Sequence, residues 1–135
     1  MDSEEVLIVA LGGRVLGLNS DNGEIQWCNE MELGGIAWVG LAVTKKYVYA
    51  SASARKVFCI DRLNGETLWT ASTTGLGRAT LICDQSHLYI CKGGLTDCFS
   101  FHGDQKWSAD LTRSGKGVAA MGLTNHVVQA DGRSK

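Results

Sequence analysis

The side chains that could bind a polar ligand are few and lie apart in the sequence. Arg14, Asn29, Glu30, Lys56 and Arg78 fall at or near segments that are expected to be loops, where binding residues often lie. Together with neighbouring charges, among them Lys92 and Asp97, they make these loops modestly basic. They could recognise hydroxyl groups or anionic ligands, although the solvation of ordinary loop charges explains them as well.

Trp38 is the aromatic candidate for ligand contact. A tryptophan combines a large apolar face with one N–H donor, so it can stack on a sugar or on an aromatic ring. The alternative is that Trp38 fills space inside the fold.

The sequence lacks the spacings that catalysis and metal binding require. Residues 114–117 contain Ser-Gly-Lys-Gly but not the spacing of a phosphate-binding loop, and residues 19–24 offer oxygen ligands without the full calcium-loop pattern. No nucleophile elbow occurs, and no Cys/His combination has a spacing that indicates a catalytic nucleophile. We therefore expect a protein that is not an enzyme and that binds no metal or cofactor.

Length and composition predict one globular domain. The chain has 135 residues, of which 44% are hydrophobic and 20% charged, and its net charge is −1. This balance makes nucleic acid an improbable main partner. The five cysteines form no CxxC pair, which favours reduced thiols. The acidic N-terminus and the short apolar run Val6–Leu11 suit neither a signal peptide nor a membrane span, so we expect a cytoplasmic or leaderless secreted protein.

Three segments of the chain repeat one pattern, in which a tryptophan follows a turn glycine by four residues. The tryptophans are 42 and 38 residues apart, a spacing typical of β-propeller blades. This fixed offset predicts that the tryptophans pack between blades and bind no ligand. The glycines are Gly23, Gly65 and Gly103, and the tryptophans are Trp27, Trp69 and Trp107.

Short apolar runs complete each repeat as four antiparallel strands. One set of runs begins at residues 6, 47, 87 and 126, and a second set, at 36–43, 79–83 and 118–123, precedes the last three of these. The Asn-Gly pairs at 22–23 and 64–65 predict type I′ hairpin turns, in which both central residues have positive φ. No sustained helical periodicity occurs, so the predicted fold class is all-β.

The pattern Asp61-x-x-x-Gly65-x-x-x-Trp69 resembles the repeat of pyrroloquinoline-quinone enzymes and their cofactor-free relatives, the quinoprotein alcohol dehydrogenase-like β-propellers. The resemblance implies that the tryptophan helps the next blade to dock. It does not imply a particular activity. The chain lacks adjacent cysteines and the length of a quinone-binding ring, so a dehydrogenase fragment is the least favoured interpretation.

The repeats predict a single propeller-repeat domain over residues 1–135, with units at about 1–33, 34–74, 75–113 and a partial unit at 114–135. They give thirteen strands, or about three blades, whereas closed rings need about four to eight. We expect a dimer, domain-swapped or head-to-tail, whose six blades close the ring. In it, residues 118–123 supply the innermost strand that the first blade lacks, from a partner or across the junction. A fragment of a longer propeller and another copy number remain alternatives.

The tail at 126–135 repeats the strand that Val6–Leu11 already provides. It could form an edge strand, displace the N-terminal strand or be disordered, and the sequence does not choose among these.

Two functions fit such a molecule. The first is a multivalent lectin-like protein that binds carbohydrate through Trp38, Asn29, Glu30 and Arg14. The alternative is a protein-interaction scaffold that binds a peptide across one face of the ring or along the edge of a blade.

Overall fold

The computed structural model describes residues 5–35, 39–124 and 126–128, and all of its regular elements are β-strands. The thirteen strands agree in number and order with the sequence prediction. They are β1 (Val6–Leu11), β2 (Arg14–Asn19), β3 (Ile25–Asn29), β4 (Gly40–Val43), β5 (Tyr47–Ser51), β6 (Lys56–Asp61), β7 (Thr67–Ser72), β8 (Thr80–Cys83), β9 (His87–Lys92), β10 (Leu95–Ser100), β11 (Gln105–Asp110), β12 (Met121–Leu123) and β13 (His126–Val128).

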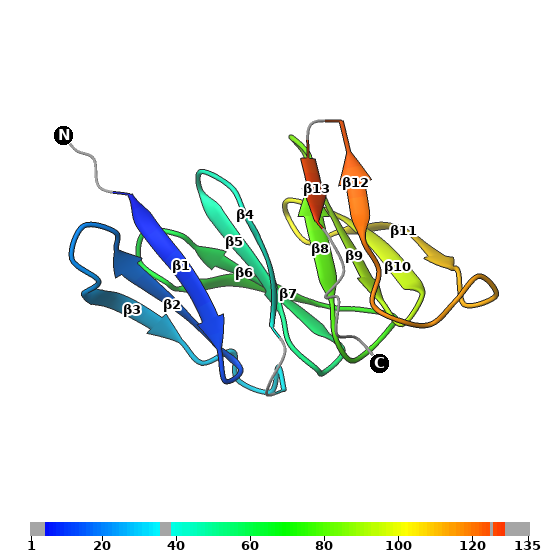
Figure 1. The fold of residues 1–135 in the computed structure, drawn as a ribbon, viewed down its shortest axis with the longest axis horizontal. Helices are drawn as coiled ribbons and strands as arrows, with labels where there is room; N and C mark the ends of the chain where they lie inside the picture. The colour runs from blue at the N-terminus through cyan, green and yellow to red at the C-terminus, as the bar shows by residue number, and fades with distance from the viewer. Residues whose placement is uncertain (1–4, 36–38, 125, 129–135) are drawn as a thin grey trace.

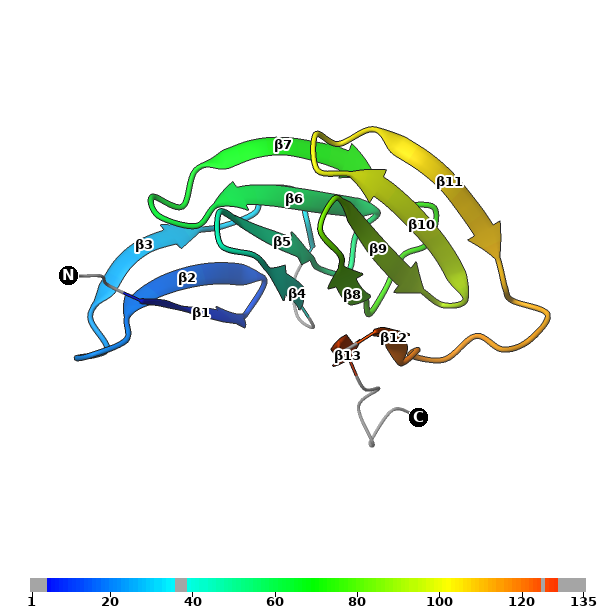
Figure 2. The same cartoon turned by 90° about the horizontal axis from the view of Figure 1, so that it is seen from above.

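The strands form antiparallel sheets that fan out side by side, like the blades of a propeller (Figures 1 and 2). The first blade is the three-stranded sheet β1–β2–β3. The second blade is β4–β5–β6–β7 and the third is β8–β9–β10–β11. The predicted all-β, blade-repeat fold is therefore confirmed. No helix of the described residues is long and apolar enough to cross a membrane.

The core lies in two layers, one on each side of the second blade. Alternate residues of a strand point to opposite faces of its sheet. Val48 and Ala50 of β5 therefore pack toward the first blade, whereas Tyr49 between them packs toward the third. Because both faces of this blade are covered, the sequences of its central strands are nearly continuous runs of apolar residues.

The hairpin turns differ from the predicted type. Gly23 and Gly65 have φ of 78° and 79°, but Asn22 and Asn64 do not have positive φ, so the type I′ prediction is wrong. The loops are longer, because the amide of each glycine bonds to the carbonyl four residues earlier, at Asn19 O and Asp61 O. In these loops the asparagine Oδ1 accepts the amide of the following glutamate, so only the glycine needs the left-handed conformation.

A bulge recurs beside each tryptophan. The pairing shifts register between Gly17 and Leu18, between Cys59 and Ile60, and between Cys98 and Phe99. The residue before each shift pairs directly with Trp27, Trp69 or Trp107. A bulge bends and twists its strand, so the same local geometry presents all three tryptophans.

The C-terminal strands begin a further sheet and do not return to the first blade. β12 pairs with β13, and both contact β8 of the third blade. They thus follow the third blade and lie beside β8 in Figure 2. The strand at Met121–Leu123 does not pair with the first blade of its own chain, and its predicted place in the first blade of a two-copy ring stays a prediction. Of the tail, 126–128 is a paired strand and 129–135 lies outside the described residues.

Candidate functional site

Trp27 joins the first blade to the second. Its side chain is 8% exposed, and its Nε1 donates a 3.0 Å hydrogen bond to Arg62 O in the turn between β6 and β7. A Cβ atom on Gly65 of that turn would lie 2.4 Å from the Trp27 ring, and one on Gly17 of its own blade would lie 2.3 Å from it. The indole is therefore held between two glycines, and its position leaves no face open to a ligand.

Trp69 repeats this contact between the second and third blades. Its Nε1 donates a 2.9 Å hydrogen bond to Phe101 O, and a Cβ on Gly103 would lie 2.9 Å from its ring. Trp107 differs, because it is 47% exposed and no later turn among the described residues contacts it. Within this chain Trp27 and Trp69 therefore lie between blades, whereas the expected packing of Trp107 between blades stays a prediction.

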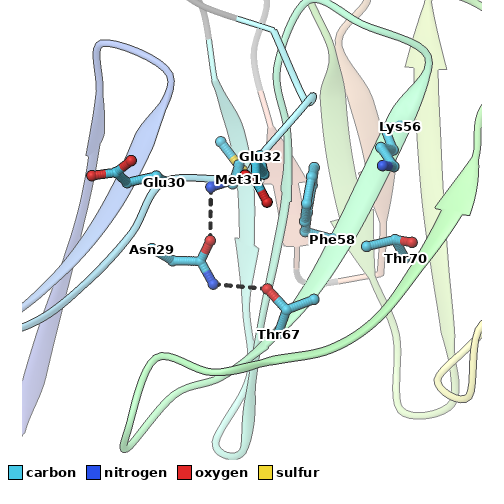
Figure 3. Close-up of a pocket in the computed structure, with 8 residues that line it drawn as sticks. All are labelled: Asn29, Glu30, Met31, Glu32, Lys56, Phe58, Thr67 and Thr70. Atoms are coloured by element: carbon cyan, nitrogen blue, oxygen red, sulfur yellow. Dashed lines mark hydrogen bonds between the residues drawn. The ribbon is translucent and has the colours of Figure 1, made fainter.

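A hollow that contains predicted site residues lies between the first two blades (Figure 3). Its volume is about 550 Å³. We call it the interblade groove. It brings together three residues that the sequence proposed and five that it did not. The former are Asn29, Glu30 and Lys56, and the latter are Met31, Glu32, Phe58, Thr67 and Thr70.

Asn29 is a positioning residue of the groove. Its Nδ2 donates to Gly65 O and to Thr67 Oγ1, both at 2.9 Å, and its Oδ1 accepts the amide of Met31 at 2.8 Å (Figure 3). These bonds tie β3 to the second blade and use all but one of the hydrogen-bonding positions of the amide. Asn29 therefore shapes the groove more than it offers itself to a ligand.

The loop after β3 sets the charge at the rim. Met31 and Leu33 have φ of 49° and 64°, a conformation that is costly for residues with a side chain. Burial of the Met31 side chain and the hydrogen bond from Gly34 N to Met31 O hold the loop in place. Because Met31 points inward, its neighbours Glu30 and Glu32 stay exposed at the rim. Sequence periodicity carries no signal for such a loop.

The opposite wall, on the second blade, combines one aromatic ring, one cation and two threonine side chains. The Phe58 ring is buried, and Lys56 Nζ lies 5.7 Å from its centroid. This distance allows a weak cation–π attraction. Two exposed carboxylates against one ammonium give the groove a net negative charge, so the basic character predicted from the sequence does not apply here.

The remaining predicted ligand residues do not line this groove. Arg14 begins β2 and is exposed, Arg78 is half-buried in the connection before the third blade, and Trp38 lies outside the described residues. The structure thus brings together three of the six candidates.

Two charges that were expected on a loop face are buried between the second and third blades. Lys92 is 1% exposed, and its Nζ donates to Ala52 O at 3.1 Å and to Ala54 O at 2.6 Å. Burial lowers the pKa of Lys92 to about 8, and the charge of Asp97 partly offsets this effect. Asp97 itself is buried and accepts hydrogen bonds from Thr74 N and Gln105 Nε2, each at 2.8 Å. Both side chains are therefore structural.

The described residues contain no group of three or more His, Cys, Asp or Glu side chains able to hold a metal ion. All five cysteines are free thiols, and only Cys28 is exposed. Burial raises the pKa of Cys59 to about 12, so this thiol is unreactive at neutral pH.

A family of PQQ-like repeat sequences, described as outer membrane protein assembly factor BamB, matches residues 11–133. The chain belongs to this PQQ-repeat β-propeller family. No curated protein is significantly similar to it in sequence.

Solved structures of several PQQ-repeat and other propellers share the fold. Sqt1 from Saccharomyces cerevisiae superposes with a TM-score of 0.69 at 12% identity, over 93% of this chain and 38% of that one. BamB from Moraxella catarrhalis gives 0.52 at 15% identity, over 92% and 50%. Quinohemoprotein alcohol dehydrogenase from Comamonas testosteroni gives 0.63 at 15% identity, over 77% and 19%. The chain thus spans between about a fifth and a half of these relatives.

Proposed function

We propose that this PQQ-repeat chain acts by binding and not by catalysis, and that it holds a segment of a partner protein in the interblade groove. The observation that carries the proposal is the pairing of two exposed carboxylates, Glu30 and Glu32, with the apolar Phe58 wall in one hollow of about 550 Å³.

The chemistry of the groove suits an extended peptide with alternating basic and apolar side chains. A lysine or arginine of the peptide would meet the rim carboxylates, and the neighbouring apolar side chain would cover the edge of Phe58. The hydroxyl groups of Thr67 and Thr70 line the same hollow and could bond to the peptide backbone. Charge-assisted contacts of this kind give orientation and specificity.

Family membership points in the same direction. The matching family is described as an assembly factor, and one structural relative is BamB itself. A factor that assists assembly has to contact other proteins, so a protein-interaction role is the simplest to carry over to this chain.

The carbohydrate hypothesis has less support. The aromatic ring of the groove, Phe58, is buried and offers no open face for stacking on a sugar. The other proposed stacking residue, Trp38, lies outside the described residues. Lectin activity therefore stays a prediction from the sequence.

The test uses a fluorescein-labelled peptide that alternates lysine and leucine, with a glutamate–leucine peptide as its charge-reversed counterpart. We expect anisotropy to report binding of the basic peptide alone, and Glu30→Gln with Glu32→Gln to weaken it about tenfold or more. The matched control, Asp21→Asn with Asp104→Asn, removes the same charge from exposed turns of the first and third blades. Equal loss in both double variants would show that only overall charge matters and would refute the groove.

A further inference from the structure

The two end blades expose complementary halves of one interface. Within the chain this interface occurs twice, between the first and second blades and between the second and third. In each case a tryptophan on the outermost strand of one blade covers the turn glycine of the next. The third blade ends with a tryptophan that no described turn receives, and the first blade begins with a turn that no described tryptophan covers.

The donor half is on the third blade. Tyr89 and Trp107 have ring centroids 6.2 Å apart with an interplanar angle of 41°. The corresponding pair of the second blade, Tyr49 and Trp69, has almost the same geometry, at 6.1 Å and 45°. The third blade covers the pair of the second blade, and Tyr49 is fully buried there. The pair of the third blade is more open, and Trp107 is 47% exposed. No acceptor among the described residues bonds to the indole N–H of Trp107, in contrast to those of Trp27 and Trp69.

The receiving half is on the first blade. A Cβ on Gly23 would meet nothing within 4 Å, although the equivalent Gly65 and Gly103 touch tryptophan rings. The carbonyl of Ser20 occupies the place of those of Arg62 and Phe101, which accept the indole hydrogen bonds. The first blade thus has both the carbonyl acceptor and the turn glycine, and no described side chain occupies either.

The sheet face beside this turn is apolar. Leu7 pairs with Leu18 and Val9 pairs with Leu16, and Leu7 is 51% exposed. At the same positions the second and third blades carry apolar residues that the preceding blade buries. The equivalent sets are Leu7, Val48 and Leu88, then Val9, Ala50 and Ile90, then Leu18, Ile60 and Phe99.

We propose that a second copy of this chain covers the apolar face of the first blade. Trp107 of one copy lies on Gly23 of the other and donates its N–H to Ser20 O. Because each copy carries both halves, two such contacts close a ring of six blades, within the range that propellers form. β12, which lies against β8, then stands where the three-stranded first blade lacks an innermost strand, and β13, which repeats the position of β1, has to give way to β1 of the other copy.

The solution mass tests this contact. Sedimentation velocity at micromolar concentration should give twice the chain mass of 14.5 kDa. Leu7→Lys places a charge in both contacts and should raise the dissociation constant at least about a hundredfold, or about tenfold per contact. The control Leu68→Lys changes a leucine on β7 that is 48% exposed and lies on neither end face, and it should leave the dimer intact.

A second readout uses Cys28, the exposed thiol. Its neighbour Trp27 points toward the second blade, so Cys28 points to the opposite, apolar face. Its reaction with a thiol reagent should slow as the wild-type protein associates, and it should stay fast in folded Leu7→Lys at every concentration. A wild-type chain that is monomeric at high micromolar concentration, with Cys28 always reactive, leaves this face to another polypeptide and overturns the proposal. Open polymers, or equal dissociation by Leu68→Lys, overturn it as well.

Discussion

Alanine substitution of the three turn glycines should reveal the tryptophan contacts between blades. All three have positive φ, at 78° for Gly23, 79° for Gly65 and 96° for Gly103. Each alanine therefore bears a similar backbone cost, about 1–2 kcal/mol. They differ in what the new methyl group meets. It would lie 2.4 Å from the Trp27 ring at Gly65 and 2.9 Å from the Trp69 ring at Gly103, with nothing within 4 Å at Gly23.

The expected order of destabilisation follows from these distances. Gly23→Ala should lower the free energy of unfolding by the backbone cost alone. Gly65→Ala must also displace a packed indole, which adds about 1–3 kcal/mol as overpacking usually does. Gly103→Ala should fall between the two, because a contact at 2.9 Å needs a smaller shift.

The assay is urea unfolding followed by tryptophan fluorescence, with the three substitutions made in the Leu7→Lys background so that contacts between copies do not contribute. Unchanged slopes with shifted midpoints would show that stability alone has changed. Equal destabilisation by Gly23→Ala and Gly65→Ala would refute the idea that a tryptophan seated on the turn glycine holds adjacent blades together.

Further tests concern Trp69, the buried Lys92 and the cysteine thiols. Trp69→Ala should lower the free energy of unfolding by about 3–5 kcal/mol in calorimetry or urea unfolding, as expected for a large cavity. Trp107→Ala in the Leu7→Lys background should lower it by about 1 kcal/mol or less. Similar losses of stability in the two variants would contradict the different surroundings of the two side chains. The pKa of Lys92 is about 8 when folded, below its ordinary 10.5, so the unfolded chain binds more protons between these values and stability rises with pH. Relative to Lys92→Met, the wild type should gain about 2 kcal/mol between pH 7 and 9.5, and a constant difference in urea midpoints would contradict the buried ammonium. In native Leu7→Lys, mass spectrometry should find a thiol label on Cys28 and none on Cys59, and rapid native labelling of Cys59 would contradict its burial.

The features that the sequence predicted are local ones that recur. The four-residue offset from Gly65 to Trp69, the apolar runs and the Gly-containing connections are each set by neighbouring residues, and their repetition makes the pattern readable. They were enough to predict the strand order and the packing of Trp27 and Trp69 between blades, but not the turn that each indole contacts.

The features that the sequence missed depend on contacts between blades. Met31 adopts a left-handed conformation because its side chain is buried against the second blade, and nothing near it in sequence signals this. From the sequence, Lys92 and Asp97 are expected to be solvated loop charges, whereas in the structure both side chains are buried. The turn at Asn64-Gly65 differs from the predicted type because the hydrogen bond from Glu66 N to Asn64 Oδ1 stabilises another loop conformation.

The groove itself could be predicted only in part. Asn29, Glu30 and Lys56 were identifiable as polar groups near loops, but their meeting depends on how the first blade stacks on the second. Arg14 and Arg78 carried the same kind of signal and do not line the groove. Charge and position along a strand therefore do not distinguish a residue of the groove from a solvated one.

Proton chemical shifts of the turn glycines offer the most direct view of how neighbouring blades meet. In an NMR spectrum of the Leu7→Lys protein, the Hα resonances of Gly65 and Gly103 should move strongly upfield, because each glycine faces an indole ring. The Hα resonances of Gly23 should remain at ordinary values. Ordinary shifts for all three glycines would contradict the stacking of blades through Trp27 and Trp69.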